Sequence, residues 1–198
     1  TVNYNTNFWS HPRQVAVIEA DEYDRSFLRL SPDIAVISSM DADHLDIYGT
    51  EELLQEAFVE FSRRLKPEGT LYSKYGLAKS ASLSAFKHYT YSLNDASADI
   101  YATNIIMQEG GYRFSVVFPD GVIDDIILNM GGLHNVENAV VSIAIARNLG
   151  IDQVKIKDAV EAFRGVKRRF EYVLKNKNLV FVDDYAHHPE ELKVLISG

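Results

Sequence analysis

Two continuous hydrophobic runs lie in the first part of the chain, Val15 to Ile18 and Ile34 to Ile37, and each run ends in polar residues. Unbroken β-branched runs are typical of strands covered on both faces, as in parallel sheets flanked by helices. Open α/β sheets bind ligands at the carboxyl ends of their strands. The pattern therefore predicts an α/β fold with its chemistry after Ile18 and after Ile37.

The next periodic segment has the spacing of an amphipathic helix. Thr50 can cap a helix that runs to about Lys66, and the segment from Gly69 to Ser73 has the pattern of another strand. The predicted apolar face of this helix comprises Leu53, Leu54, Ala57, Phe58, Phe61 and Leu65. Strand, helix and strand in this order predict a parallel crossover unit.

From about Lys87 to Asn129 the pattern changes to short alternating strands, with turn signals at Gly110-Gly111 and Pro119-Asp120-Gly121. This pattern predicts a small antiparallel sheet appended to the mostly parallel one. Two helices should follow, from about Asn135 to Leu149 and from about Asp152 to Phe163.

Two further strand-like stretches, Phe170 to Leu174 and Leu179 to Val182, follow these helices. We place a domain boundary near Lys167, so that residues 1–167 form one domain and residues 168–198 begin another. The first residue is Thr1, not methionine, and the last residues fall where a helix begins, so we expect the chain to be a fragment of a longer protein.

Composition narrows the class of protein. Apolar residues make up 46% and charged residues 24% of the 198-residue chain, as in soluble globular proteins. The net charge of -8 argues against a broad nucleic-acid surface, and no apolar run approaches the roughly 20 residues of a membrane helix. The absence of cysteine excludes thiolate zinc sites and fits a cytoplasmic protein.

Acidic residues gather after both hydrophobic runs. After the first run come Glu19, Asp21, Glu22 and Asp24. Such a group favours a hard cation such as Mg²⁺, and a solvated acidic turn explains it equally well. After the second run, His44 stands among Asp41, Asp43 and Asp46. Because Mg²⁺ prefers oxygen, this histidine by itself suggests a transition metal or proton transfer, with a lone surface histidine as the plainer alternative.

The second half of the chain holds candidate nucleotide-binding residues. Asn135 and Asn138 share a helix face and can pair with the edge of adenine, although N-capping also explains Asn135. Arg169 can offer its guanidinium to a phosphate, and a solvated basic turn is the alternative. His187-His188 lacks the spacing of a zinc pair, which favours a loop lining a cleft. The chain contains no Gly-Lys dipeptide and hence no Walker-type phosphate loop.

Taken in order, the motifs of the chain resemble those of the Mur ligase family over nearly the whole length. These motifs are Asn3-Tyr4-Asn5-Thr6-Asn7, Glu19-Ala20-Asp21-Glu22-Tyr23-Asp24, Asp43-His44-Leu45-Asp46-Ile47-Tyr48-Gly49, His134-Asn135 with Asn138-Ala139, Arg168-Arg169-Phe170 and Asp183-Asp184-Tyr185-Ala186-His187-His188-Pro189. The resemblance implies a P-loop NTPase-like central ATPase domain without its phosphate loop, followed by the start of a Rossmann-like domain. Within the family it is greatest to the bacterial enzymes that join L-alanine to UDP-N-acetylmuramate in peptidoglycan synthesis.

The resemblance also implies roles for individual residues, with ATP and Mg²⁺ as cofactors. Glu19 and His44 match magnesium ligands, Asn135 and Asn138 an adenine-contacting pair, Arg169 a γ-phosphate contact, Asp184 a nucleotide contact, and Tyr185 and His188 the amino-acid pocket. Arg169 and His44 would take part in catalysis. Enzymes that attach a tripeptide to the same sugar, and a non-catalytic module of the same fold, are the alternatives. Without the phosphate loop, the fragment should not turn over.

Overall fold

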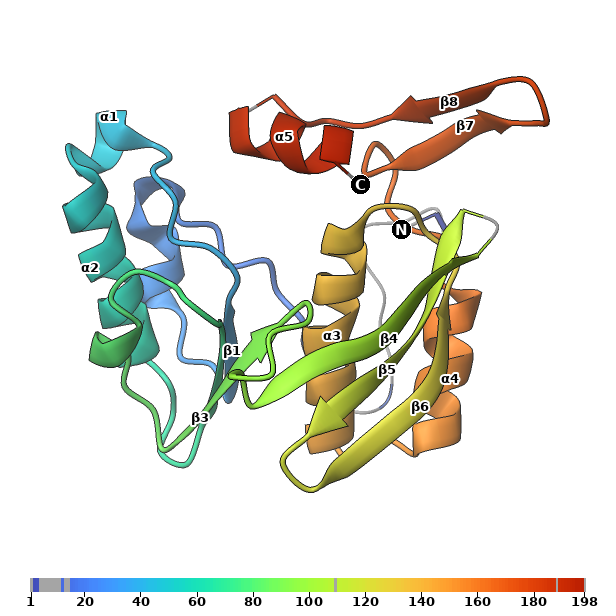
Figure 1. Cartoon of the computed structure of the whole chain (residues 1–198). Coiled ribbons are helices and arrows are strands. Elements are labelled where there is room, and N and C mark those ends of the chain that lie inside the picture. Colours follow the sequence, from blue (N-terminus) through green and yellow to red (C-terminus); the bar gives the residue numbers. More distant parts are fainter. Residues whose placement is uncertain (1, 4–11, 13–14, 109, 188, 198) are drawn as a thin grey trace. The chain divides into compact units, whose positions relative to one another are not determined.

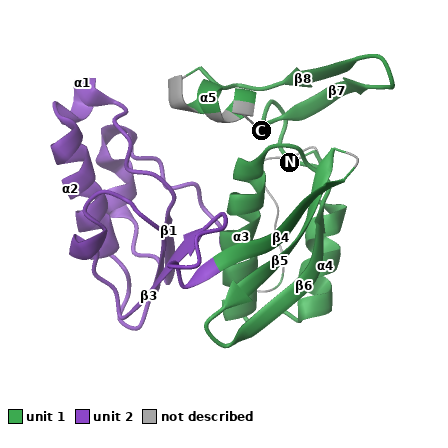
Figure 2. Cartoon of the chain, viewed as in Figure 1, with its two compact units in different colours: residues 1–13, 101–198 green, residues 14–100 purple. Residues whose placement is uncertain are grey.

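A computed structural model describes residues 2–3, 12, 15–108, 110–187 and 189–197 of the chain (Figure 1). The chain forms two compact units (Figure 2). Unit 1 comprises residues 1–13 and 101–198, and unit 2 comprises residues 14–100. The predicted boundary near Lys167 falls inside unit 1, and it stays a prediction.

Unit 2 contains three parallel strands, β1 (Ile34–Ile37), β2 (Thr70–Lys74) and β3 (Lys87–Ser92). Strand β2 pairs in parallel with both neighbours, which confirms the predicted crossover unit. The expectation that the chain turns antiparallel from Lys87 is wrong for β3. Strand direction depends on the connection, and residues 75–86 supply the dozen or so residues that a parallel crossover needs.

Helix α2 (Glu51–Ser62) begins where the sequence predicts, because the Thr50 hydroxyl accepts a hydrogen bond from the amide of Leu53. It ends at Ser62, short of the predicted Lys66. The Leu53 side chain is 44% exposed and lies outside the core, contrary to the predicted face. The buried face of helix α2 packs with β1, β2 and the 3-10 helix η1 (Tyr23–Arg29) in one hydrophobic core. Two short elements complete the unit, α1 (Leu45–Tyr48) and η2 (Ser80–Ser82).

The run from Val15 to Ile18 does not form a strand. It has no strand partner among the described residues, and the Val17 side chain is 95% exposed. The prediction of a buried strand here is therefore wrong. A β-branched run supplies the propensity for a strand, but the hydrogen-bonded ladder also needs a neighbouring strand.

Unit 1 contains the antiparallel strands β4 (Ile100–Gln108), β5 (Gly111–Phe118) and β6 (Gly121–Leu128), joined at the two predicted turns. Helix α4 (Gln153–Ala162) packs against β6 and against α3 (Leu133–Asn148). Strands β7 (Glu171–Lys175) and β8 (Val180–Asp183) form a hairpin, and α5 (Pro189–Ser197) follows. The predicted α/β class, a parallel sheet with helices and an added antiparallel sheet, is confirmed.

Helix α3 begins at Leu133, two residues before the predicted start at Asn135, whereas α4 begins at Gln153, one residue after the predicted start, with Asp152 as its N-cap. The Asp152 carboxylate accepts a hydrogen bond from the amide of Val154. Within the described residues, no helix is both long and apolar enough to cross a membrane.

Candidate functional site

Three potential metal ligands of unit 2 lie together: Glu22, Asp43 and His44. One ligand atom from each lies within 4.8 Å of the others. His44 Nε2 is 3.6 Å from a Glu22 carboxylate oxygen, and His44 Nδ1 is 3.8 Å from an Asp43 oxygen. We call these three residues the acidic cluster. It joins the segment before η1 to the segment after β1, the two places where the sequence predicts chemistry.

Tyr48 ties these two segments together. Its hydroxyl donates a 2.6 Å hydrogen bond to the carbonyl oxygen of Glu22, and its side chain is only 2% exposed. Burial raises the pKa of the Tyr48 phenol above its ordinary value, while the guanidinium of Arg25 over its ring lowers it. The ring of Tyr23 packs edge-on against the His44 imidazole at 5.3 Å between centroids.

Two carboxylates and one imidazole can hold a divalent cation. Mg²⁺ accepts the two carboxylates readily, and a mixed oxygen and nitrogen set also suits Mn²⁺. The predicted ligand His44 belongs to the acidic cluster, whereas the predicted ligand Glu19 is exposed and lies outside it. The sequence grouped Glu22 and Asp43 with the acidic residues without assigning them as ligands. The signal in the sequence was their closeness along the chain to the predicted ligands, since Asp43 directly precedes His44 and Glu22 lies three residues after Glu19.

The two predicted adenine contacts of unit 1 lie at the start of α3. The Asn135 side chain donates a 2.7 Å hydrogen bond to the carbonyl oxygen of Gly131, and the Asn138 side chain is exposed one turn further on. The alternative that Asn135 caps the helix is wrong, because Gly132 occupies the cap with φ at 84°. Both amides therefore lie at a helix N-terminus, which attracts anions.

His134 connects this helix end to the segments after α4. Its Nδ1 is buried and has no hydrogen-bond partner within the described structure. Burial lowers the pKa of His134, with smaller effects from the nearby Asp184 carboxylate, which raises the pKa, and the Arg169 guanidinium, which lowers it. The ring of Phe170 packs against this imidazole at 6.2 Å. The predicted residues Arg169 and Asp184 thus lie near the N-terminus of α3.

Arg169 sits in a tight turn between two residues with left-handed backbone, Arg168 (φ 59°) and Phe170 (φ 49°). The Arg169 side chain is 54% exposed, and its Nη1 lies 3.8 Å from a Glu191 carboxylate oxygen. Asp184 accepts two backbone hydrogen bonds of 2.7 Å each, from the amides of Phe170 and Ala186. Arg169 is therefore presented to solvent, while Asp184 is engaged with the backbone.

Tyr185, predicted for an amino-acid pocket, is 51% exposed. Its ring lies under the Arg168 guanidinium at 4.7 Å and edge-on to His187 at 5.2 Å. His188, the other residue predicted for this pocket, lies outside the described residues.

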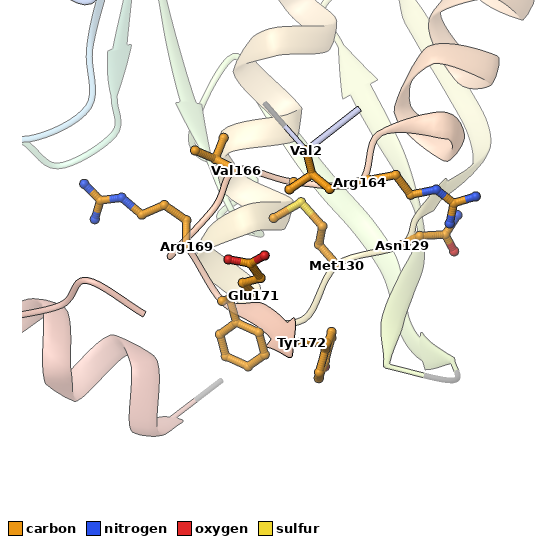
Figure 3. A pocket seen from close by; sticks show the side chains of 10 residues that line it. Val2, Asn129, Met130, Arg164, Val166, Arg169, Glu171 and Tyr172 are labelled. Atoms are coloured by element: carbon orange, nitrogen blue, oxygen red, sulfur yellow. The ribbon is translucent and has the colours of Figure 1, made fainter. Parts of the chain in front are cut away.

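A cavity of about 140 Å³ lies beside the Arg169 turn (Figure 3). The residues that line it are Val2, Asn129, Met130, Arg164, Gly165, Val166, Arg169, Phe170, Glu171 and Tyr172. In Figure 3, the guanidinium groups of Arg164 and Arg169 extend away from the cavity on opposite sides, whereas Met130 and Glu171 lie at its centre. With a carboxylate and a thioether facing inward, this cavity is not suited to a phosphate.

Solved structures with a similar fold include proteins that are named as ligases. The chain resembles the UDP-N-acetylmuramate-alanine ligase of Thermotoga maritima with a TM-score of 0.73 and 26% identity, over 87% of this chain and 39% of that one. It resembles MurF from Acinetobacter baumannii with a TM-score of 0.74 and 22% identity, over 87% and 38% of the two chains. The second likeness concerns the fold alone.

The model of the Mur ligase middle domain matches residues 6–146, and the chain belongs to the Mur ligase family. It is 39% identical over 193 residues to a protein of Flavobacterium johnsoniae named UDP-N-acetylmuramate--L-alanine ligase, covering 98% of this chain and 41% of that protein. A protein of Cytophaga hutchinsonii with the same name is 42% identical over 202 residues, covering 100% and 43%. The chain thus spans about two fifths of the length of these relatives.

Proposed function

We propose that this chain is the nucleotide- and metal-binding part of an ATP-dependent ligase that joins L-alanine to UDP-N-acetylmuramate in bacterial peptidoglycan synthesis. The observation that carries the proposal is its identity of about 40% to relatives named for this reaction, over almost all of its length. The names of these relatives favour L-alanine over the tripeptide of the rival ligase as acceptor, and the non-catalytic module remains the alternative. A cytoplasmic location remains a prediction.

Nucleotide binding at the start of α3 rests on four residues. Asn135 and Asn138 would contact adenine, Arg169 would meet the γ-phosphate, and Asp184 would lie beside the nucleotide. Their support is proximity, because the Arg169 and Asp184 charges both act on His134 in the first turn of α3. Tyr185 and His188 would lie nearer the incoming amino acid.

Mg²⁺ would be held in the acidic cluster, by Glu22 and Asp43 through oxygen and by His44 through nitrogen. The close spacing of these three side chains is the support for this assignment. Glu19 remains a predicted further ligand. When bound, the cation would offset the negative charge that spreads over the transferring phosphoryl group.

The reaction would proceed in two transfers. A carboxylate oxygen of the sugar attacks the γ-phosphorus of ATP, the bond to ADP breaks, and an acyl phosphate forms. The amine of L-alanine then attacks the acyl carbon, loses a proton, and displaces phosphate to give the amide. Arg169 would stabilise the charge on the phosphoryl group, since its planar guanidinium can bind two oxygens at once.

Phosphate release from ATP by the full-length enzyme tests the proposal, with UDP-N-acetylmuramate and either L-alanine or the tripeptide as acceptor. We expect release that depends on L-alanine. Release that depends on the tripeptide would contradict the acceptor and retain the nucleotide assignments. If neither acceptor led to phosphate release, the chain would be interpreted as part of a non-catalytic binding module. The 198-residue chain alone should release no phosphate under the same conditions.

A further inference from the structure

We infer that Asp184 is a positioning residue, whose carboxylate locks the strained turn that carries Arg169. This inference rests on the proposed role of Arg169 at the phosphate. In this inference Asp184 has a structural role even when no nucleotide is bound, whereas the sequence resemblance implies only that Asp184 contacts the nucleotide.

The backbone of the Arg169 turn is strained on both sides. Arg168 and Phe170 have φ values of 59° and 49°, a region that side chains with a Cβ atom disfavour. Such residues persist where the surrounding structure holds them, and they concentrate at functional sites. A turn of this kind needs bonds from outside itself.

Asp184 supplies such bonds from another part of the chain. Its Oδ2 accepts from the amide of Phe170, and its Oδ1 accepts from the amide of Ala186, both at 2.7 Å. One carboxylate thereby fastens the backbone after Arg169 to the segment after β8, fourteen residues away along the chain. Because both oxygens accept a short hydrogen bond from an amide, the carboxylate is well placed to hold the backbone.

Further contacts at Arg168 also hold the backbone of the turn. The amide of Tyr185 donates to the carbonyl oxygen of Arg168 at 2.8 Å, and the Arg168 guanidinium lies over the Tyr185 ring at 4.7 Å. The amide of Arg168 donates to a Glu171 carboxylate oxygen at 2.9 Å. These three contacts all engage Arg168, the residue before Arg169, and leave the Arg169 side chain 54% exposed. The backbone of the turn is thus bonded on both sides of Arg169, while the Arg169 guanidinium is partly exposed beside the Glu191 carboxylate.

Ring packing limits where the turn can move. Phe170 packs against His134 at 6.2 Å and edge-on against Tyr172 at 5.7 Å. A side-chain carbon at Gly131 would collide with the Phe170 ring, so the turn lies directly against the backbone before α3. Loss of the Asp184 bonds would release the Arg169 backbone while Phe170 stays anchored through its ring.

Amide hydrogen exchange by NMR on the nucleotide-free 198-residue chain tests this role. In Asp184→Ala, exchange at Phe170 and Ala186 should accelerate at least about tenfold, as expected when a protected amide loses its acceptor. The decisive amide is that of Arg169, which donates to Val166 and not to Asp184. Its acceleration would show that the turn itself opens.

Two further variants make the test specific. Asp184→Asn keeps one carbonyl oxygen and should give a smaller acceleration, and it also serves if Asp184→Ala fails to fold. Asp183→Ala removes the same charge from the adjacent residue, whose carboxylate lies 4.0 Å from the Arg168 guanidinium, and it should leave all three amides unchanged.

Unchanged exchange at Phe170 and Ala186 in Asp184→Ala would overturn the inference. Acceleration at these two amides with no change at Arg169 would overturn it as well, because Asp184 would then hold its own surroundings and not the arginine. Failure of the proposed ligase activity would appear separately, as absent phosphate release from the full-length enzyme. In that case the exchange differences between Asp184→Ala and the wild-type chain would still be as predicted above.

Discussion

The carboxylates of the acidic cluster in unit 2 and the carboxylate of Asp184 in unit 1 differ in how many of their oxygens accept hydrogen bonds from backbone amides and in which side chains lie beside them. Each Asp184 oxygen accepts a 2.7 Å bond from a backbone amide. In the acidic cluster, Glu22 faces the His44 imidazole at 3.6 Å, and Asp43 accepts from the amide of His44. A carboxylate whose two oxygens both accept from backbone amides holds the chain in place, whereas two carboxylates gathered beside an imidazole favour a cation.

The largest effect should come from removing the packing behind the acidic cluster. Phe27 is 1% exposed and contacts the rings of Phe58 and Phe61 at 5.3 and 5.0 Å. Phe27→Ala should lower the free energy of unfolding by about 3–5 kcal/mol, as measured by urea denaturation. The control Phe86→Ala changes a side chain that is 72% exposed and should cost less than about 0.5 kcal/mol. Equal losses would mean that Phe27 is not a core residue.

The second prediction compares cation binding by the acidic cluster with cation binding by Asp184. Removing both charges with Glu22→Gln and Asp43→Asn should weaken Mn²⁺ binding to this chain at least about tenfold, because affinity follows the charge of the ligands. The Mn²⁺ affinity is measured from the electron paramagnetic resonance signal of free Mn²⁺. Asp184→Asn should leave the Mn²⁺ affinity unchanged. A comparable loss in Asp184→Asn would contradict the distinction between the two sites.

A smaller effect should follow when the bond between the two segments of the acidic cluster is removed. Tyr48→Phe deletes the hydroxyl that donates to the Glu22 carbonyl oxygen at 2.6 Å. Stability should fall by about 1 kcal/mol, and Mn²⁺ should bind more weakly but less so than in the double variant. Tyr89→Phe, which removes a hydroxyl on β3, is the matched control. Wild-type Mn²⁺ affinity in Tyr48→Phe would show that the hydroxyl does not position Glu22.

The smallest effect concerns pH. Burial lowers the pKa of His134 in unit 1 and of His88 in unit 2 below the ordinary value of 6.5. Each of these imidazoles therefore binds a proton more readily in the unfolded chain than in the folded chain. Their contribution to the free energy of unfolding is complete above pH 6.5 and is lost as the pH falls. Urea unfolding between pH 8 and about pH 5 should show a shallower decline in His134→Gln than in the wild type. Parallel declines would show that His134 does not contribute.

The sequence predicted elements whose signals are local. Thr50 caps α2 as expected, and α4 begins within one residue of its predicted start at Asp152, because a cap needs only a side chain and an amide a few residues away. The turns around Gly110 and Pro119 likewise follow from residue types with particular backbone preferences. The sequence drew attention to His44 because it stands among acidic residues after a hydrophobic run, whereas its role as a magnesium ligand is implied by the family resemblance and stays a prediction.

The sequence failed where the outcome depends on a distant neighbour. Val15 to Ile18 has strand propensity but no pairing strand among the described residues, and Leu53 follows helical spacing yet points outside the core. The parallel direction of β3 depends on its pairing with β2. In each case the same residues could satisfy two arrangements, and packing selected one of them.

By itself, the sequence determined the α/β class and the approximate bounds of most elements, and it named His44 and Arg169 as candidate site residues, whose roles stay predictions. Only the tertiary structure joined Glu22 and Asp43 to His44 and bonded Asp184 to the backbone beside Arg169. Periodicity and capping act over a few residues, so they can be read along the chain. A carboxylate's role depends on which donors or charges surround it in space, and those neighbours are brought together only when the chain folds.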